Sequence, residues 1–455
     1  MEKTIAAIST APAPGGIGIV RISGGEAFAV AEKVFRGVSG KKLSQMKGYT
    51  AQLGGAYTPG GEKLDDVVAL VYRGPKSYTG EDVVELSCHG GLYMTKRLLQ
   101  LVLDAGAAPA GPGEFTRRAF LNGKMDLAQA EAVMGLISAS GEQARKAALA
   151  GSTGVLSRKI ESIKQGLLEQ AAHLAAWADF PEEDVPQVEE AALLEGIRQG
   201  EKALEELLQG FDRGRMYREG LVTVIAGRPN AGKSTLMNLL SGCQRSIVTQ
   251  YAGTTRDVVE ETVMVAGVPL RLADTAGIRD TDDPVESIGV QAARQRLETA
   301  QLVLAVFDSS QALEKEDWEL MDALEKVPAI AIVNKNDLPT RMDVEAIQKR
   351  FEKTVSLSAA TGEGLAALEQ ALSEILDTKD FHPQEGVLFT QRQRMDAQTA
   401  LDSLREGEQA LVLGLTLDAV TVCVEDALHA LAALTGEQVS EKIVDRVFEE
   451  FCVGK

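Results

Sequence analysis

The chain has 455 residues of ordinary globular composition, 45% hydrophobic and 25% charged, which is enough for about two or three domains. Its formal net charge of -19 argues against broad binding of nucleic-acid backbones, although a discrete basic patch on one domain remains possible. The four cysteines lack C-x-x-C spacing and indicate neither a zinc site nor a disulfide framework. Because no signal peptide and no long apolar run occurs, we expect a cytoplasmic protein with no membrane partner.

Residues 4–112 have the mixed pattern of an α/β domain. Strands are predicted at residues 4–8, 17–22, 66–72 and 83–87, and helices at residues 25–35 and 92–103. The glycines at positions 15, 16 and 18 do not form a dinucleotide fingerprint, because a strand follows them and not a helix. We interpret them as a turn.

A helical pattern replaces this mixture after Phe115. Residues 123–210 are rich in Ala, Leu, Glu, Gln and Lys, with apolar residues three and four positions apart, which predicts an array of helices. The acidic segment 179–184 interrupts this array, and we interpret it as a solvated connection between helices rather than a metal site. The helical pattern returns beyond residue 380, so the sequence predicts one helical domain with another domain inserted into it.

The inserted segment alternates strands with helices, which is typical of a mostly parallel sheet covered by helices. Strands are predicted at residues 221–226, 262–265, 269–272, 302–307, 329–333 and 354–357. The first strand leads into GRPNAGKS at residues 227–234, an instance of G-x-x-x-x-G-K-[ST], and then into a helix. This context predicts a phosphate-binding loop in which Lys233 reaches the β- and γ-phosphates and Ser234 holds Mg²⁺.

Three further motifs follow in the order that a GTPase requires. NKND at residues 334–337 supplies Asp337, whose carboxylate can accept from N1–H and the amine of guanine but finds no such donors on adenine. SAA at residues 358–360 would support the same base, so GTP is favoured over ATP. DTAG at residues 274–277 is positioned to hold Mg²⁺ through water and to sense the γ-phosphate, and GTT at residues 253–255 lies where a switch segment belongs.

The residue after DTAG is Ile278, which cannot orient water as the glutamine of Ras-type enzymes does. Another group must therefore do so, and the acidic candidates downstream are Asp280, Asp282, Asp283 and Glu286. No arginine finger is obvious, although Arg256 and Arg279 are nearby. Asn230 and the carbonyl-rich segment 249–254 could instead coordinate a monovalent cation that bridges the phosphates.

Several long motifs extend over nearly the whole chain: GIGIVRISG at residues 16–24, YTGEDVVE at 78–85, GPGEFTRRAFLNGK at 111–124, the phosphate-binding loop, GTTRD at 253–257 and FCVGK at 451–455. With them the chain resembles the MnmE (TrmE) family of tRNA-modification GTPases. The resemblance implies a multidomain α/β plus α fold. Its parts are an α/β N-terminal domain at residues 1–118, a discontinuous helical domain at 119–217 plus 381–455, and an inserted Ras-like P-loop GTPase domain at 218–380.

The resemblance also implies an activity with cofactors and partners. By this resemblance, the N-terminal domain is expected to dimerise and to bind 5-formyltetrahydrofolate or a related one-carbon tetrahydrofolate. K⁺-stimulated GTP hydrolysis is expected to accompany dimerisation of the GTPase domains across a homodimer. The implied reaction adds an aminomethyl or carboxymethylaminomethyl group at C5 of the wobble uridine of tRNA. It requires the flavoprotein MnmG (GidA), which forms a heterotetramer with this chain.

Residue roles follow from the same resemblance. The K⁺ ligands are Asn230, Thr249, Tyr251 and Thr254, the Mg²⁺ ligands are Ser234 and Thr255, and Glu286 positions the attacking water. The folate-binding positions are Arg21, Glu85 and Lys124, with Lys455 close by, and Cys452 is the family's C-terminal cysteine, implied to act in the modification. With the motifs, the predicted GTP-binding residues are Asn230, Ala231, Gly232, Lys233, Ser234, Thr235, Thr249, Gln250, Tyr251, Ala252, Gly253, Thr254, Thr255, Asp274, Thr275, Ala276, Gly277, Asn334, Lys335, Asp337, Ser358, Ala359 and Ala360.

Two other functions stay open at this stage. One is an assembly or signalling GTPase whose flanking domains only bind partners, and the other is a one-carbon transferase whose GTPase domain is purely regulatory. The set of Arg21, Glu85 and Lys124, together with the Cys452 tail, favours tRNA modification, because a plain switch does not need these residues.

Overall fold

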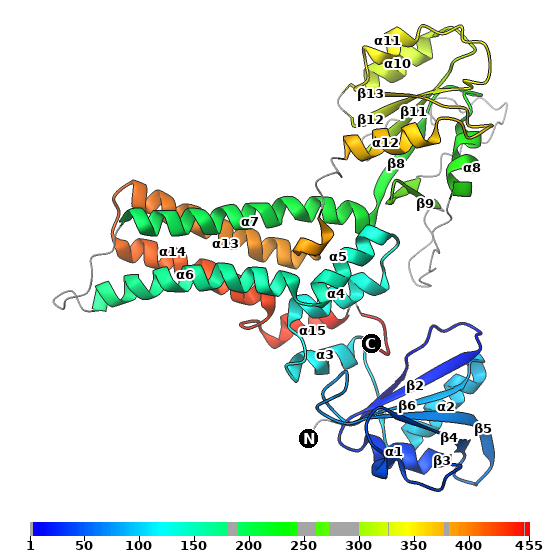
Figure 1. Ribbon diagram of the computed structural model, residues 1–455, viewed down its shortest axis with the longest axis vertical. Helices are drawn as coiled ribbons and strands as arrows, with labels where there is room; N and C mark the ends of the chain where they lie inside the picture. The colour runs from blue at the N-terminus through cyan, green and yellow to red at the C-terminus, as the bar shows by residue number, and fades with distance from the viewer. Residues whose placement is uncertain are drawn as a thin grey trace. The chain divides into compact units, whose positions relative to one another are not determined.

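The computed structural model describes residues 3–179, 190–243, 261–272, 300–325, 327–376, 382–449 and 451–455. The chain divides into two compact units: Met1–Met134 with Ile160–Glu189 and Asp402–Lys455, and Gly135–Lys159 with Glu190–Leu401. Each unit contains one β-sheet, and helices make up much of the rest (Figure 1). Among the described helices, none is both long enough and apolar enough to span a lipid bilayer.

The first unit contains a seven-stranded sheet in the order β3-β4-β5-β6-β2-β1-β7. Neighbouring strands of this sheet pair antiparallel, except β1 and β7, which pair parallel. The strands are β1 (Ile5–Ile8), β2 (Ile17–Ser23), β3 (Phe35–Gly37), β4 (Thr50–Tyr57), β5 (Lys63–Tyr72), β6 (Val83–His89) and β7 (Ala108–Pro109). The helical elements along this part of the chain are α1 (Ala27–Val34), η1 (Leu43–Gln45), α2 (Leu92–Asp104) and α3 (Glu114–Leu121).

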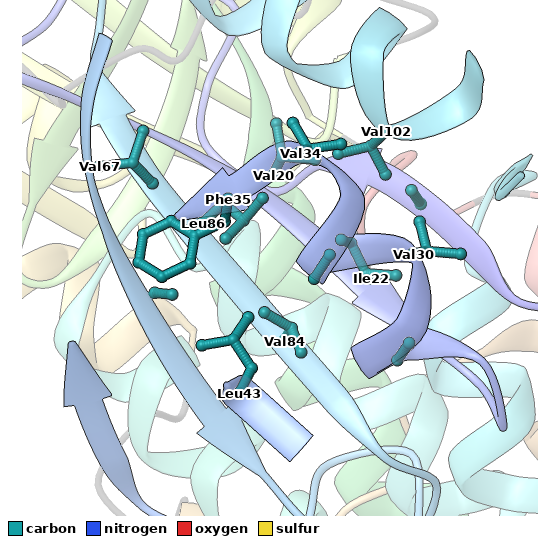
Figure 2. Packing of buried hydrophobic residues seen from close by; sticks show 14 of the residues in the cluster. Val20, Ile22, Val30, Val34, Phe35, Leu43, Val67, Val84, Leu86 and Val102 are labelled. Atoms are coloured by element: carbon teal, nitrogen blue, oxygen red, sulfur yellow. The ribbon is translucent and has the colours of Figure 1, made fainter. Parts of the chain in front are cut away.

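Helices α1 and α2 pack on one face of this sheet. Alternate residues of β2 and β6 are buried there, namely Val20, Ile22, Val84 and Leu86, and they join side chains of α1 and α2 in one core. Figure 2 shows side chains of the sheet and of α1, including Val30 and Val34, gathered in this layer. Because side chains alternate along a strand, Arg21 and Glu85 point to the opposite face.

The second unit contains a six-stranded sheet in the order β13-β12-β11-β8-β10-β9, parallel throughout except where β9 pairs with β10. The strands are β8 (Leu221–Ala226), β9 (Glu261–Val265), β10 (Val268–Leu272), β11 (Leu302–Asp308), β12 (Ala329–Asn334) and β13 (Lys353–Ser356), and the helices along them are α8 (Lys233–Cys243), α10 (Lys315–Ala323), α11 (Val344–Gln348) and α12 (Leu365–Ile375). Since β8, β11, β12 and β13 run parallel, the loops at their carboxyl ends meet at one edge of the sheet, where ligands of open α/β sheets bind.

Helices precede and follow the second sheet in the chain. They are α4 (Leu127–Ile137), α5 (Glu142–Ser152), α6 (Val155–Asp179) and α7 (Glu190–Glu219) before it, and η3 (Pro383–Glu385), α13 (Gln391–Val412), α14 (Leu417–Thr435) and α15 (Glu441–Glu449) after it. Buried residues of α7 recur at Leu193, Ile197, Leu204, Leu207 and Phe211, which is the spacing of one helical face. The predicted helical segments before and after the second sheet are thus confirmed among the described residues.

The predicted strands and helices of the described residues are confirmed within a few residues at their ends, whereas β3, β7 and the longer strand β4 were not predicted. The sequence of β4, TAQLGGAY, contains Gly54 and Gly55, which weaken a local strand signal. Gly54 is required by packing, because a Cβ there would lie 2.2 Å from the Arg36 carbonyl oxygen of the neighbouring β3. Pairing with β3 and β5 therefore decides the conformation, and no local preference predicts it.

Candidate functional site

The phosphate-binding loop connects β8 to α8 in the second unit. Two of its glycines are needed for close approach: a Cβ on Gly227 would lie 2.4 Å from the Val306 carbonyl oxygen, and a Cβ on Gly232 would lie 2.1 Å from Nδ2 of Asn334. Both have positive φ, 153° and 98°, which favours glycine further. The two fixed glycines of the motif hold the loop against β11 and β12.

Lys233 begins α8, and its ammonium group lies across the loop. Its Nζ donates to the carbonyl oxygens of Gly227 at 2.9 Å and Arg228 at 2.7 Å. Ser234 is exposed in the first turn of α8, where backbone N–H groups and the helix dipole favour an anion. This arrangement fits a bound phosphate group, with the Ser234 hydroxyl available to a magnesium ion.

The predicted base-recognition residues meet at the carboxyl ends of β12 and β13. The Asn334 side chain donates to the Ala231 carbonyl at 2.8 Å and accepts from the Ala359 N–H at 2.9 Å, so it joins this region to the phosphate-binding loop. The Ser358 hydroxyl donates to Oδ1 of Asp337 at 2.6 Å. The second carboxylate oxygen of Asp337 and the open lone pair of the first can accept from a base that offers two adjacent donors.

In the first unit, Arg21 of β2 lies directly opposite Glu85 of β6 in the strand register. Nε of Arg21 donates to Oε1 of Glu85 at 2.8 Å, and the two side chains are only 17% and 14% exposed. The guanidinium group also lies 5.5 Å from the ring centroid of Phe115 and 5.8 Å from that of Tyr78. This pair therefore forms a partly desolvated, aromatic-lined polar site on the sheet face that α1 and α2 leave open.

The C-terminal tail lies against this site. The Gly454 carbonyl accepts from Nη1 of Arg21 at 3.3 Å and from the Ser9 hydroxyl at 3.1 Å. The Lys455 carbonyl accepts from the Phe115 N–H at 3.1 Å, and the Cys452 carbonyl accepts from the Gly113 N–H at 3.3 Å. The tail thus brings the partly buried Cys452 and Lys455 to the N-terminal sheet.

Lys124 has a different position. Its Nζ donates to the Pro75 carbonyl at 2.9 Å, on the loop that precedes the YTGEDVVE motif. The structure gives no hydrogen bond or ion pair between Lys124 and the Arg21–Glu85 pair within the described residues. It therefore brings together Arg21, Glu85 and the backbone of the tail, and it ties Lys124 to a neighbouring loop.

Comparisons with known proteins show which family the chain is similar to. A family model described as "GTP-binding protein TrmE N-terminus" matches residues 4–124, and one described as "MnmE helical domain" matches residues 127–452. Proteins named tRNA modification GTPase MnmE from Alkaliphilus oremlandii and Symbiobacterium thermophilum are 43% and 45% identical to this chain, with 100% of each chain covered in both cases.

The chain belongs to the MnmE family of tRNA modification GTPases. It is a GTP hydrolase that acts in tRNA modification, and its fold class is the predicted combination of a TrmE N-terminal domain, MnmE helical regions and a P-loop GTPase. A solved structure of Era from Aquifex aeolicus is 27% identical and covers 42% of this chain and 67% of its own, with a TM-score of 0.28 that is too low to bear on the fold.

Many predicted site residues of this MnmE-family chain lie outside the described residues. They are Thr249, Gln250, Tyr251, Ala252, Gly253, Thr254, Thr255, Asp274, Thr275, Ala276, Gly277 and Glu286, together with the alternative acidic and arginine candidates Asp280, Asp282, Asp283, Arg256 and Arg279. The acidic segment from residue 180 to 184 is outside them as well. The switch, the K⁺ loop and the water-positioning residue therefore stay predictions.

Asp308 is the buried partner of the predicted site residue Lys335, and the sequence analysis missed it. It ends β11, and its carboxylate accepts from Nζ of Lys335 at 2.7 Å, although the Asp308 side chain is only 4% exposed. Burial raises the pKa of Asp308, but hydrogen bonds from Lys335 and Ser310 outweigh burial, and the net pKa is lowered. The signal in the sequence was a carboxylate at the end of a parallel strand, the edge where ligand sites lie.

Replacing Asp308 with asparagine is expected to lower the free energy of unfolding by about 2 kcal/mol near neutral pH, because Lys335 loses a charged partner. Since the folded-state pKa of Asp308 is below the ordinary 3.8, the contribution is complete above that value and disappears as pH falls through the lower folded-state value. Denaturant unfolding of the full chain between about pH 2 and pH 7 would measure this.

The matched control is Asp322→Asn, which removes an exposed ion pair with Arg350 and should change stability little. A stability difference between wild type and Asp308→Asn that stayed constant through the acid range would contradict the assigned pKa direction.

Gly454→Ala is expected to release the tail from the sheet. Gly454 has φ of 95°, and a Cβ there would lie 2.2 Å from the Ile8 carbonyl oxygen, so the backbone must move. Strain on the order of 2 kcal/mol would raise hydrogen exchange at residues 452–455 about thirtyfold. Gly414→Ala is the control, because Gly414 has φ of 67° but open space around it. Equal exchange in both variants would mean that the tail is not held by this contact.

Proposed function

We propose that this chain hydrolyses GTP to drive modification of the wobble uridine of tRNA at C5, together with the flavoprotein MnmG. The product would carry an aminomethyl or carboxymethylaminomethyl group, and the reaction would take place in the cytoplasm. The observation that carries this proposal is the Arg21–Glu85 pair with the docked C-terminal tail, because a GTPase that acted only as a switch has no use for it.

The pair fits a reduced folate. Glu85 can accept from the N–H and amino groups of a pterin, and Arg21 suits an anionic ligand. The hydroxyl of Tyr72 donates to Oε2 of Glu85 at 3.5 Å. Burial and the charge of Glu85 raise the pKa of Tyr72, so the hydroxyl keeps its proton and remains a donor. In this proposal Lys124 and Lys455 contact the rest of the folate, the folate supplies a one-carbon unit, and Cys452 acts at the modification site.

In this proposal, different residues of the GTP site bind the phosphates, the magnesium ion and the base. Lys233 contacts the β- and γ-phosphates, Ser234 and Thr255 hold Mg²⁺, and Asp337 selects guanine, with Ala231, Gly232, Thr235 and the 358–360 segment around the nucleotide. Glu286 would position the attacking water in place of the glutamine that the chain lacks. Asn230 is exposed in the phosphate-binding loop, and in this proposal its side chain joins Thr249, Tyr251 and Thr254 as a ligand of K⁺.

GTP hydrolysis is expected to be at least about tenfold faster in K⁺ than in Na⁺, because a cation that bridges the phosphates would replace the missing arginine finger. Asn230→Ala should remove most of this difference. Asn238→Ala, an exposed asparagine of α8, is the control and should keep it. Steady-state phosphate release in the two salts measures both effects, and equal wild-type rates in the two salts would refute the cation assignment.

A homodimer formed through the N-terminal domain is part of the proposal. The sheet face opposite α1 and α2 carries exposed apolar side chains, including Leu53 at 58% and its cross-strand neighbour Val68 at 40%. A second copy of this chain would cover them, as exposed apolar patches often mark interfaces. We also propose the domain boundaries 1–118, 119–217 plus 381–455, and 218–380, since the helical family model matches on both sides of the second sheet.

Mass spectrometry of the wobble uridine tests the function as a whole. Cells that lack this gene should lose the C5 modification, and the wild-type gene should restore it, whereas Lys233→Ala and Glu85→Gln should not. Modification that persists without the gene would exclude this function and favour an assembly or signalling role.

A further inference from the structure

A cluster of cations lies on the N-terminal domain of a chain that is otherwise strongly acidic. Residues 33–61 contain five basic residues and no aspartate or glutamate, although the whole chain has a net charge of -19. Four of the five, Lys33, Arg36, Lys41 and Lys42, line one hollow of about 450 Å³. We call these four residues the basic edge, because they lie around β3, an edge strand of the first sheet.

The cations of the basic edge are exposed and available. Lys33 donates to the Ala105 carbonyl at 2.8 Å, and the Arg36 guanidinium group lies 4.7 Å from the ring centroid of Tyr57. No ion pair within the described residues involves any of the four. One carboxylate, Glu32, also lines the hollow, but its Oε1 accepts from the N–H and hydroxyl of Ser44 at 2.8 and 2.7 Å. The local charge is therefore about three positive units.

A simpler explanation of these cations is protection of the edge strand β3, since lysines on edge strands prevent pairing between sheets. That role needs one or two charges along the strand itself. Here Lys41 and Lys42 lie beyond β3, on the segment before η1, and they face the same hollow as Lys33 at the end of α1. Cations that converge on a hollow from three elements suit a polyanion better than they suit edge protection.

We propose that the basic edge binds the phosphate backbone of the tRNA substrate. This rests on the family's action on tRNA, and it goes further by assigning the contact to a surface. The site of Arg21 is four strands away in the same sheet, about 19 Å at the usual strand spacing, so RNA held at the edge stays near the proposed folate site. A local cationic surface also explains how an acidic chain can approach RNA.

The test replaces two lysines of the basic edge with glutamate, K41E/K42E, in the full chain. The control is K96E/K349E, which makes the same change in net charge at exposed lysines that do not line the hollow. Fluorescence anisotropy with an unmodified tRNA transcript at several salt concentrations measures affinity. We expect K41E/K42E to weaken binding at least about tenfold and to reduce the salt slope by about 1.5, with the control near wild type.

Three kinds of result would overturn the assignment of the basic edge to tRNA. An equal loss in both variants would mean that net charge alone matters, and no loss in K41E/K42E, or no measurable binding by wild type, would mean that this surface does not bind tRNA. Binding of the basic edge to vesicles of anionic lipid, with tRNA binding unchanged by K41E/K42E, would assign it to a membrane. The GTPase rate should be unchanged in both variants. A wild type that binds tRNA through the basic edge while the wobble uridine stays unmodified would refute the proposed function and leave this inference intact.

Discussion

Replacing Asp337 with asparagine is expected to weaken GTP binding by about 10⁴-fold and to create affinity for xanthosine triphosphate. The Asp337 carboxylate offers two acceptors, one of which already accepts from Ser358 at 2.6 Å. Asparagine keeps one acceptor but turns an amide donor toward the guanine amine, so two donors face each other. Xanthine carries a carbonyl at that position and restores the pair. Two buried donors that face each other can change a binding affinity by a factor of this size.

Nucleotide titration of the full chain with a fluorescent GTP analogue, competed with GTP and xanthosine triphosphate, measures both affinities. Asp343→Asn is the matched control, because it removes the same charge from the same unit. Asp343 caps α11 by accepting from the Ala346 N–H, and asparagine caps a helix equally well. If Asp337→Asn lost GTP without gaining the xanthine nucleotide, Asp337 would have a structural role and not a base-reading one.

The second large effect is expected at Glu85. Glu85→Gln should weaken binding of 5-formyltetrahydrofolate about 100-fold, because the amide would present a donor where the pterin also presents donors. Arg21 would also lose its charged partner at a site where both side chains are mostly buried. Replacing Arg21 with alanine should weaken binding comparably and destabilise the first unit as well, since Glu85 would be left partly buried without its cation.

Calorimetric titration of the full chain with the folate, paired with a thermal melt of each variant, separates recognition from stability. The control is Asp66→Asn on β5, where the Lys63–Asp66 pair is 47% and 65% exposed and is expected to contribute little. Normal folate affinity in a folded Glu85→Gln variant would remove the Arg21–Glu85 pair from the proposed site. It would not affect the GTPase prediction, which depends on the second unit.

The site residues that the sequence predicted most directly are those that belong to contiguous motifs. The loop at residues 227–234 is recognisable from its own glycines, because Gly227 and Gly232 have positive φ, which glycine adopts most readily. The strands of both sheets are also predictable from local sequence, since burial alternates along β2 and β6 and is continuous along β11. Together with the NKND motif at residues 334–337, these patterns sufficed to predict a parallel-sheet domain that binds GTP.

Contacts between distant parts of the chain were not predictable in the same way. Nη1 of Arg21 and the Gly454 carbonyl are 433 positions apart, and only the fold shows that the tail covers this side chain. Lys335 belongs to the NKND motif, but its buried partner Asp308 lies outside every motif. Strand β4 forms because two neighbours pair with its glycine-containing sequence.

By itself, then, the sequence determined a GTP-binding parallel sheet, an α/β N-terminal domain and a divided set of helices. The resemblance supplied Arg21, Glu85 and the Cys452 tail as separate residues with a common role. Tertiary structure decided that strand register puts Arg21 opposite Glu85 and that a glycine without a Cβ lets the tail reach them. The physical reason is the distance along the chain over which each feature is decided. Backbone conformation and periodicity depend on neighbouring residues, whereas desolvated polar pairs depend on which surfaces the fold brings together.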